Sequence, residues 1–529
     1  MNIFKSLNRG KTVRFLIRIM LVISAAVLFV LTRFSVTGTF YARQYMGMES
    51  QLMQDSVLKN ILMFILFLSL SLILGGMWKK LFKTGENKAA FLILLISSAA
   101  MFLAGLFFLI RHPYYMEGDQ LNTFYGGVYA SMEDSDVRYA MFMPGGYFGI
   151  YPQQKGLAFI YMILYGFFGD RLFTVMKFFH LIYPQLILYA GYGAMSKSRV
   201  LPFTKVLYCL MLLFCLPLYL YLPYMYGDLP SIAFSFCSMY FMSVLITDHK
   251  KIMVIPMGIF AALAVFVRMQ VWIFVIAAVI TLCLKAADQR KKILVLGAAL
   301  MVLFSMAGTY AVEKYYDSVS GYGHVEGVPS VCWVAMGLRM KDGYPGVYSR
   351  LNQGLFEDNG FDADKTAADA KEYIKESLDY MKNDPAYTRA FFSLKLRLEW
   401  TNPDYEGFFS SGKCWSDESG VTSDKVPAKL TDLYRGNLCV KALNFANYYQ
   451  SAVYMACFVL TLICLFGRKK EISSVTVLSL IYMIGGFLFF AVWENKSRYI
   501  LPFFICLVWC APIAVNELAN LFSGVKKSS

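Results

Sequence analysis

Long apolar runs, each of about 20 residues and separated by short polar stretches, occupy most of this chain. A helix of that length crosses the hydrocarbon core of a bilayer. Because that core offers no water to backbone groups, and because the runs lack the alternation of a barrel strand, each run is expected to be an α-helix. The pattern predicts twelve spans, near residues 15–34, 57–76, 89–110, 172–195, 203–223, 229–247, 252–267, 270–285, 293–312, 443–466, 472–492 and 500–518.

Lysine and arginine give these spans an expected orientation, since short loops rich in them stay in the cytoplasm. Basic residues precede the first span and recur after every second span. They are Lys5, Arg9, Lys11, Arg14, Arg18, Lys79, Lys80, Lys197, Arg199, Lys250, Lys251, Arg290, Lys291, Lys292, Arg468, Lys469, Lys470, Lys526 and Lys527. We therefore expect a multi-pass protein of the cell membrane with both termini in the cytoplasm.

A shorter apolar run at residues 157–169 does not fit this alternation, because a full span there would reverse the side of every later basic loop. We interpret it as a juxtamembrane or re-entrant helix. A thirteenth span is the alternative.

The expected fold class is an all-α polytopic membrane protein with about twelve transmembrane helices plus juxtamembrane helices. Residues 1–312 form a transmembrane module that includes an acidic outer loop, 111–156. Residues 313–440 form a small, mainly helical extracytoplasmic domain, and residues 441–529 carry the C-terminal transmembrane helices. Helical spacing within the domain predicts helices at 364–382 and 386–400, the second amphipathic and suited to the membrane surface.

Composition agrees with this class, because 58% hydrophobic and 16% charged residues cannot cover a soluble globule with polar surface. The net charge of +15 resides in the membrane part, since residues 313–440 hold 20 acidic and 15 basic residues. Membrane lipids are expected partners. No nucleic-acid motif supports a polynucleotide partner, and no nucleotide-binding loop supports an ATP-driven pump.

Candidate chemistry begins with Glu117 and Asp119, which follow an apolar span in the acidic outer loop. Asp119 is the candidate general base, because a carboxylate held near a membrane surface can accept a proton from an acceptor hydroxyl. Glu117 is expected to assist it by orienting the acceptor or binding a cation. A solvated acidic loop is the alternative.

A second cluster, residues 493–499, lies between the last two spans and on the same expected face. Arg498 offers a planar fork to a phosphate and Lys496 a point charge. Arg268, between two apolar stretches, should face a cavity or a partner rather than lipid. For Glu494 and Arg498 the alternative to a substrate contact is an ion pair with each other. Asp228, in a second outer turn, is a further candidate, and its alternative is a helix cap.

These pieces together resemble the GT-C superfamily of polytopic glycosyltransferases, which includes protein O-mannosyltransferases and lipid A aminoarabinose transferases. The resemblance covers roughly residues 100–510. It lies in the acidic outer loop, the second outer turn at residues 226–230, the segment 267–270, and a Glu-x-x-x-Arg-Tyr-x-x-Pro pattern. That pattern comprises Glu494, Arg498, Tyr499 and Pro502.

The resemblance implies a sugar donor linked to a polyprenyl phosphate and an extracytoplasmic glycan or lipid acceptor. Arg268, Arg498 and Lys496 would bind the donor phosphate. The substrate-binding residues would be Asp228, Glu494, Tyr499, Gln153, Lys155 and Tyr151. A divalent cation, Mg²⁺ or Mn²⁺, held by Glu117, Asp119 and Asp228 is an open alternative to a metal-free site.

The function expected from these residues is that of an inverting membrane glycosyltransferase acting on a wall polysaccharide, a teichoic acid or a glycolipid. Two alternatives stay open: a flippase or transporter of lipid-linked saccharides, and an envelope polysaccharide polymerase. The acidic and basic candidates lie at the outer ends of spans, which favours the transferase, because a transporter needs polar groups reachable from both faces.

Of eleven cysteines, three fall in the outer region: Cys332, Cys414 and Cys439. A disulfide between Cys414 and Cys439 is one interpretation, and the odd third cysteine leaves the pairing open.

Overall fold

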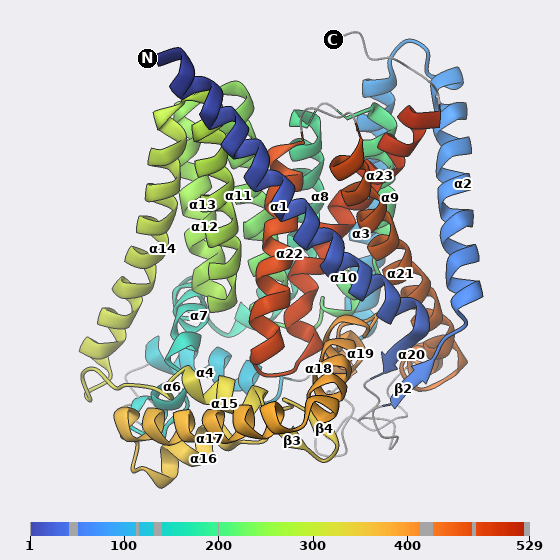
Figure 1. The fold of residues 1–529 in the computed structure, drawn as a ribbon. Helices are drawn as coiled ribbons and strands as arrows, with labels where there is room; N and C mark the ends of the chain where they lie inside the picture. The colour runs from blue at the N-terminus through green and yellow to red at the C-terminus, as the bar shows by residue number, and fades with distance from the viewer. Residues whose placement is uncertain are drawn as a thin grey trace.

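A computed structural model describes residues 2–41, 51–112, 116–131, 140–198, 200–412, 427–467 and 472–522. The described chain is mostly helical, with two short antiparallel hairpins (Figure 1). One hairpin pairs β1 (Gly38–Tyr41) with β2 (Gln51–Gln54), and the other pairs β3 (Met340–Lys341) with β4 (Tyr344–Pro345). The prediction of an all-α polytopic protein is confirmed at this level.

Ten helical segments in the described ranges are long and apolar enough to cross a membrane, and they coincide with ten of the twelve predicted spans. Their helices are α1 (Asn2–Thr37), α2 (Val57–Leu81), α3 (Glu86–Arg111), α8 (Leu172–Lys197), α11 (Asp228–Asp248), α13 (Trp272–Gln289), α14 (Lys292–Val319), α21 (Asn437–Phe466), α22 (Ser474–Val492) and α23 (Leu501–Phe522).

The other two predicted spans are shorter than expected. Residues 203–223 form two helices, α9 (Pro202–Leu213) and α10 (Leu216–Leu220), instead of one. Pro217 explains the break, because its ring would clash with the carbonyl of Leu213 in a continuous helix. Residues 252–267 form α12 (Val254–Val267), preceded by a single 3₁₀ turn.

The helices pack around two central members, α11 and α23, whose apolar windows are almost completely buried. Helix α11 packs on α8 and α12, and α23 packs on α21, α22 and α9. By contrast α2 is peripheral and presents most of its apolar side chains outward, as a lipid-facing helix would. Helix α1 runs obliquely across the bundle (Figure 1).

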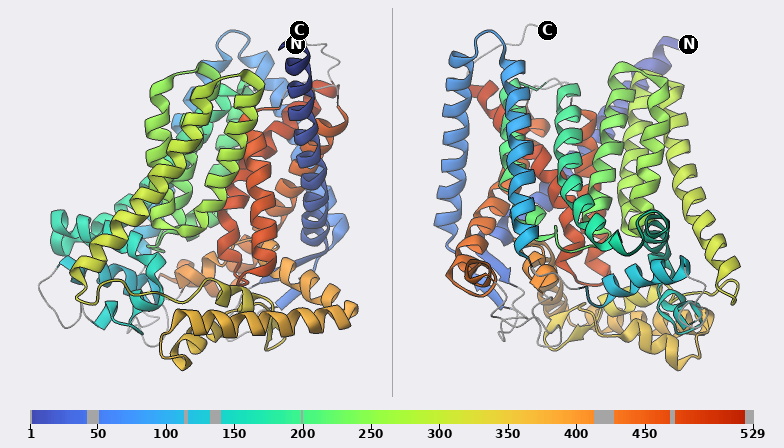
Figure 2. Two further views of the ribbon diagram at one scale, coloured as in Figure 1. Left: turned by 60° about the vertical axis from the view of Figure 1, so that its left-hand side comes forward. Right: turned by 180° about the vertical axis from the view of Figure 1, so that it is seen from behind.

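The two ends of the bundle differ in character. Helix α1 begins and α23 ends at one end, where the basic turns after α2, α11 and α13 also lie (Figures 1 and 2). The opposite end carries a layer of short helices, among them α4 (Asp119–Ser131), α6 (Tyr147–Ile150) and α7 (Lys155–Phe168). Helix α7 is the predicted juxtamembrane segment, and it packs on α4 in this layer.

The region 313–440 completes that layer. Helix α17 matches the helix predicted at 364–382, and α18 matches the one predicted at 386–400. The helices are α15 (Val331–Gly337), α16 (Leu351–Asp358), α17 (Ala363–Asn383), α18 (Pro385–Trp400), α19 (Gly407–Gly412) and α20 (Ala428–Arg435).

This region packs into the bundle and is not a detached domain. Trp400 and Tyr405 are fully buried in the main apolar core of the protein. The second half of α18 also buries Lys395 and Glu399 against the rest of the protein, which its amphipathic pattern did not indicate. The predicted disulfide remains a prediction, since Cys414 lies outside the described residues.

Candidate functional site

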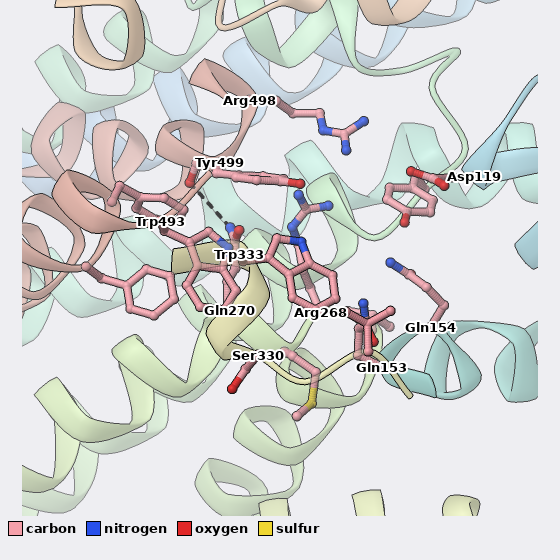
Figure 3. A pocket seen from close by; sticks show the side chains of 16 residues that line it. Asp119, Gln153, Gln154, Arg268, Gln270, Ser330, Trp333, Trp493, Arg498 and Tyr499 are labelled. Carbon is pink, nitrogen blue, oxygen red and sulfur yellow. Dashed lines mark hydrogen bonds between the residues drawn. The ribbon is translucent and has the colours of Figure 1, made fainter. Parts of the chain in front are cut away.

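A cavity of about 360 Å³ lies where the bundle meets the layer of short helices, within the size range of small-molecule sites. Six segments distant in sequence form its walls. The lining residues are Asp119, Gln153, Gln154, Tyr226, Val267, Arg268, Met269, Gln270, Val328, Ser330, Trp333, Phe489, Phe490, Trp493, Arg498 and Tyr499 (Figure 3). Of the predicted site residues, the structure brings Asp119, Gln153, Arg268, Arg498 and Tyr499 together here.

Asp119 starts helix α4, directly after Gly118, whose φ of +55° suits a residue without a side chain. The Tyr147 hydroxyl donates a hydrogen bond to Asp119 Oδ1 at 3.2 Å. Burial and the charge of Asp119 raise the pKa of Tyr147 well above its usual value, so this hydroxyl keeps its proton. Asp119 is exposed, and Tyr147 fixes the direction of its carboxylate.

Arg268 sits at a break between two helices. Helix α12 ends at Val267, Arg268 is extended, and a 3₁₀ turn over Met269–Val271 leads into α13. A terminal nitrogen of the Arg268 guanidinium lies 3.0 Å from Asp228 Oδ1, in an ion pair with both side chains almost fully buried. The prediction that Arg268 faces a cavity rather than lipid agrees with this position.

Arg498 belongs to a 3₁₀ turn, Ser497–Ile500, that precedes α23. Its Nε atom lies 3.9 Å from the same Asp228 Oδ1, and one of its terminal nitrogens donates to the Tyr224 hydroxyl. Arg498 therefore pairs with Asp228. The ion pair between Glu494 and Arg498, considered from the sequence as an alternative, does not form.

Asp228 thus pairs with two buried guanidinium groups. Neither arginine contact has hydrogen-bond geometry, and the Nε atoms of Arg268 and Arg498 have no hydrogen-bond partner among the described residues. The rings of Tyr226 and Tyr499 lie 5.2–5.7 Å from the two guanidinium groups, in cation–π contact. Guanidinium groups of this kind donate charge-assisted hydrogen bonds to anions.

Glu494 and Lys496 support the turn without lining the cavity. Tyr499 donates its hydroxyl hydrogen to Glu494 Oε2 at 3.2 Å, and Lys496 Nζ lies 3.8 Å from Glu494 Oε1. Glu406, which sequence reasoning did not select, accepts hydrogen bonds from the backbone and the hydroxyl of Ser497. These contacts hold the segment that presents Arg498 and Tyr499.

Other predicted residues lie outside the cavity wall. Lys155 is buried at the start of α7, near the carboxylates of Glu313 and Asp317. Tyr151 contacts Tyr348 and the ring of Trp333, so it lies behind one wall of the cavity.

Two carboxylates that the sequence assigned to substrate or cation also lie off the wall. Glu117 precedes α4 and is half-buried. Asp228 supports the arginines from behind instead of facing the cavity.

A shared metal site does not fit these carboxylates. Asp228 is already paired with Arg268 and Arg498. Across the described ranges, no group of three or more His, Cys, Asp or Glu residues is arranged to hold a metal ion.

Several lining residues were not selected from the sequence. Gln154, Gln270 and Trp493 adjoin residues that were, so position in the chain was an available signal. Ser330 and Trp333 come from the region 313–440, and no local pattern marked them. Their place in the wall depends on how that region packs under the bundle.

Fold and cavity together define a polytopic helical membrane protein with one polar, aromatic-lined cavity described at the end of the bundle opposite its basic turns. No protein-family model, no curated protein and no solved structure matches the chain.

Proposed function

We propose that this protein is a membrane glycosyltransferase of the GT-C type. It moves a sugar from a polyprenyl-phosphate-linked donor to an acceptor outside the cytoplasm, such as an envelope polysaccharide, a teichoic acid or a glycolipid. The observation that carries the proposal is the cavity itself: one carboxylate, Asp119, and two arginines, Arg268 and Arg498, line the same space.

The chemistry of transfer uses both kinds of group. The acceptor hydroxyl attacks C1 of the donor sugar from the face opposite the phosphate, and the bond between C1 and the phosphate oxygen breaks. Asp119 takes the hydroxyl proton as the new bond forms. The carrier leaves as polyprenyl phosphate, and Arg268 and Arg498 stabilise the charge that develops on it. Inversion at C1 follows from the single displacement.

The topology proposed with this function has twelve crossings, in which α12 and the broken pair α9–α10 complete the ten longer helices. The end with the basic turns then lies in the cytoplasm and the cavity lies on the opposite side. A donor held in the lipid can reach a cavity at that depth without a nucleotide-binding domain. The candidate reactive groups, Asp119, Arg268 and Arg498, all lie in the cavity at one end of the bundle, which supports a transferase over a transporter.

The test is to incubate purified protein with undecaprenyl phosphates bearing different monosaccharides, with candidate acceptors present, and to measure release of carrier phosphate and binding of donor. We expect wild-type protein to release carrier phosphate with at least one donor. Asp119→Asn should lower the rate by about 100-fold or more, the range for loss of a general base, while donor binding is retained.

Asp170→Asn is the matched control, because Asp170 is an exposed carboxylate in the 3₁₀ turn Gly169–Arg171 that precedes α8, outside the cavity wall. It should keep the wild-type rate. Absence of turnover and of binding with every monophosphate donor would refute the transferase and favour a test of lipid-linked saccharide transport.

A further inference from the structure

Two tryptophans from distant parts of the chain lie close together in the cavity wall, with parallel ring planes. Trp333 belongs to α15 and Trp493 follows the end of α22. Their rings are almost parallel, at 3°, with centroids 5.9 Å apart. Phe489 stacks on Trp493 with a centroid distance of 4.7 Å and covers part of that ring, and the three rings together form an aromatic surface of the wall. The transfer chemistry above makes no use of this surface.

Both indoles pack against apolar clusters of the protein on one side and line the cavity on another. Trp78, Trp400 and Trp509 are buried in the protein, whereas Trp333 and Trp493 are only half-buried and line the cavity. Partly exposed indoles in a concave site are typical of ligand contact, because a large apolar face is kept available at low cost in side-chain entropy.

Three uncharged polar residues line the same cavity. Gln153 and Gln154 come from the 3₁₀ turn before α7, and Ser330 precedes α15. Figure 3 shows these three on the side of the cavity opposite Arg498. Amides and hydroxyls both donate and accept hydrogen bonds, as neighbouring sugar hydroxyls require. An aromatic face bordered by such groups matches a pyranose ring, which has an apolar C–H face and a polar rim.

The two indoles are held in place from behind. Lys395 donates hydrogen bonds to the carbonyls of Gly337, at the end of α15, and of Trp493. Asn495 donates to the carbonyls of Pro345 and Gly346. A side chain at Gly337 would come within 2.4 Å of the Trp493 carbonyl oxygen, so glycine allows this close approach. The surface is therefore preorganised.

We propose that Trp333 and Trp493 form a platform that binds a pyranose ring, with Gln153, Gln154 and Ser330 bonding its hydroxyls. This deepens the proposed transfer reaction and rests on it for the source of the ring. That source is either the sugar of the lipid-linked donor or a sugar of the acceptor glycan.

The experiment compares binding of three probes to purified wild type, Trp333→Leu and Trp333→Phe. The probes are undecaprenyl phosphate without a sugar, undecaprenyl phosphates bearing glucose, mannose, galactose or N-acetylglucosamine, and the methyl glycosides of these sugars. Tyr380→Leu, which removes an exposed aromatic of α17, is the control. Retained binding of bare undecaprenyl phosphate shows that the variants fold.

We expect Trp333→Leu to weaken binding of the sugar-bearing ligand by about tenfold or more, as for loss of one stacking contact, and Trp333→Phe to weaken it less. Bare undecaprenyl phosphate should change by less than about twofold. A loss confined to lipid-linked sugars assigns the platform to the donor, and a loss confined to methyl glycosides assigns it to the acceptor.

The outcomes separate this inference from the proposed function. If Trp333→Leu binds every sugar probe as wild type does, or if wild type binds none, the platform is refuted, whatever the effect of Asp119→Asn. If wild type releases no carrier phosphate yet Trp333→Leu weakens sugar binding, the platform stands and the transfer reaction falls.

Discussion

At the scale of single residues, the arrangement around Asp228 decides what the cavity can hold. One buried carboxylate compensates two buried guanidinium groups, and the distances of 3.0 and 3.9 Å show that it serves Arg268 better than Arg498. A buried charge without full compensation is costly. A phosphate would give these two guanidinium groups a second direct anionic partner, so this shortage of direct partners favours anion binding.

Asp228→Asn should expose this shortage. The change keeps the shape of the side chain but leaves both arginines uncompensated, which we expect to lower the free energy of unfolding by roughly 3–5 kcal/mol. Undecaprenyl phosphate should restore more stability to the variant than it adds to wild type, measured as the shift in thermal unfolding midpoint in detergent. Equal shifts in the two proteins would place the anion elsewhere, and Asp170→Asn should behave as wild type.

At the scale of elements, the buried Lys395 joins parts that the chain order keeps apart. Its ammonium, on α18, bridges the end of α15 to the end of α22. Burial lowers the pKa of Lys395 to about 8, although Glu399 and Glu494 oppose the shift. The connection between the outer layer and the bundle thus contains a group that titrates near neutral pH.

This shift predicts a pH dependence of stability. Between pH 8 and 10.5 the folded protein has released a proton that the unfolded chain still binds. The free energy of unfolding contributed by Lys395 therefore rises with pH across this window, by up to about 3 kcal/mol. The thermal unfolding midpoint of wild type, relative to that of Lys395→Met, should therefore increase as the pH is raised from 7 to 10. Parallel curves would contradict this assignment, and Lys382→Met, on the exposed side of α17, should run parallel to wild type.

Element by element, the sequence predicted more of the helices than of their interruptions. Apolar length located the ten long helices, and apolar spacing located α17 and α18, because both depend on neighbouring residues only. The break before Pro217 was missed, since an apolar run scores the same whether or not it bends. The burial of Lys395 and Glu399 was missed for another reason: it arises only where α18 meets β4 and the 3₁₀ turn Ser497–Ile500.

At the scale of the whole molecule, the sequence indicated that widely spaced charges would meet, and the structure brings Asp119, Arg268 and Arg498 into one cavity. The positive-inside pattern and the acidic loop carry that information, because both follow from which end of a span a residue occupies. The aromatic wall was not predictable, since Trp333 reaches the cavity through the tertiary packing of the region 313–440.

The proposed orientation is testable by thiol labelling. Glu376→Cys, exposed on α17, should react with a membrane-impermeant maleimide in intact cells, because the cavity end is proposed to face outward. Lys83→Cys, exposed in the turn between α2 and α3, should react only after permeabilisation. Wild type reports the background from the native cysteines. The reverse result would place the cavity in the cytoplasm and remove the argument for a donor delivered in the lipid.

The distribution of the cavity walls along the chain also bears on biosynthesis. The walls begin at Asp119 and end at Tyr499, and a ribosome delivers these segments in that order. Until α22 and the turn after it have entered the membrane, Arg498 and Trp493 are missing and the space has no closed shape. A chain that stops before α22 therefore lacks part of the cavity wall, and insertion of the last helices completes the cavity.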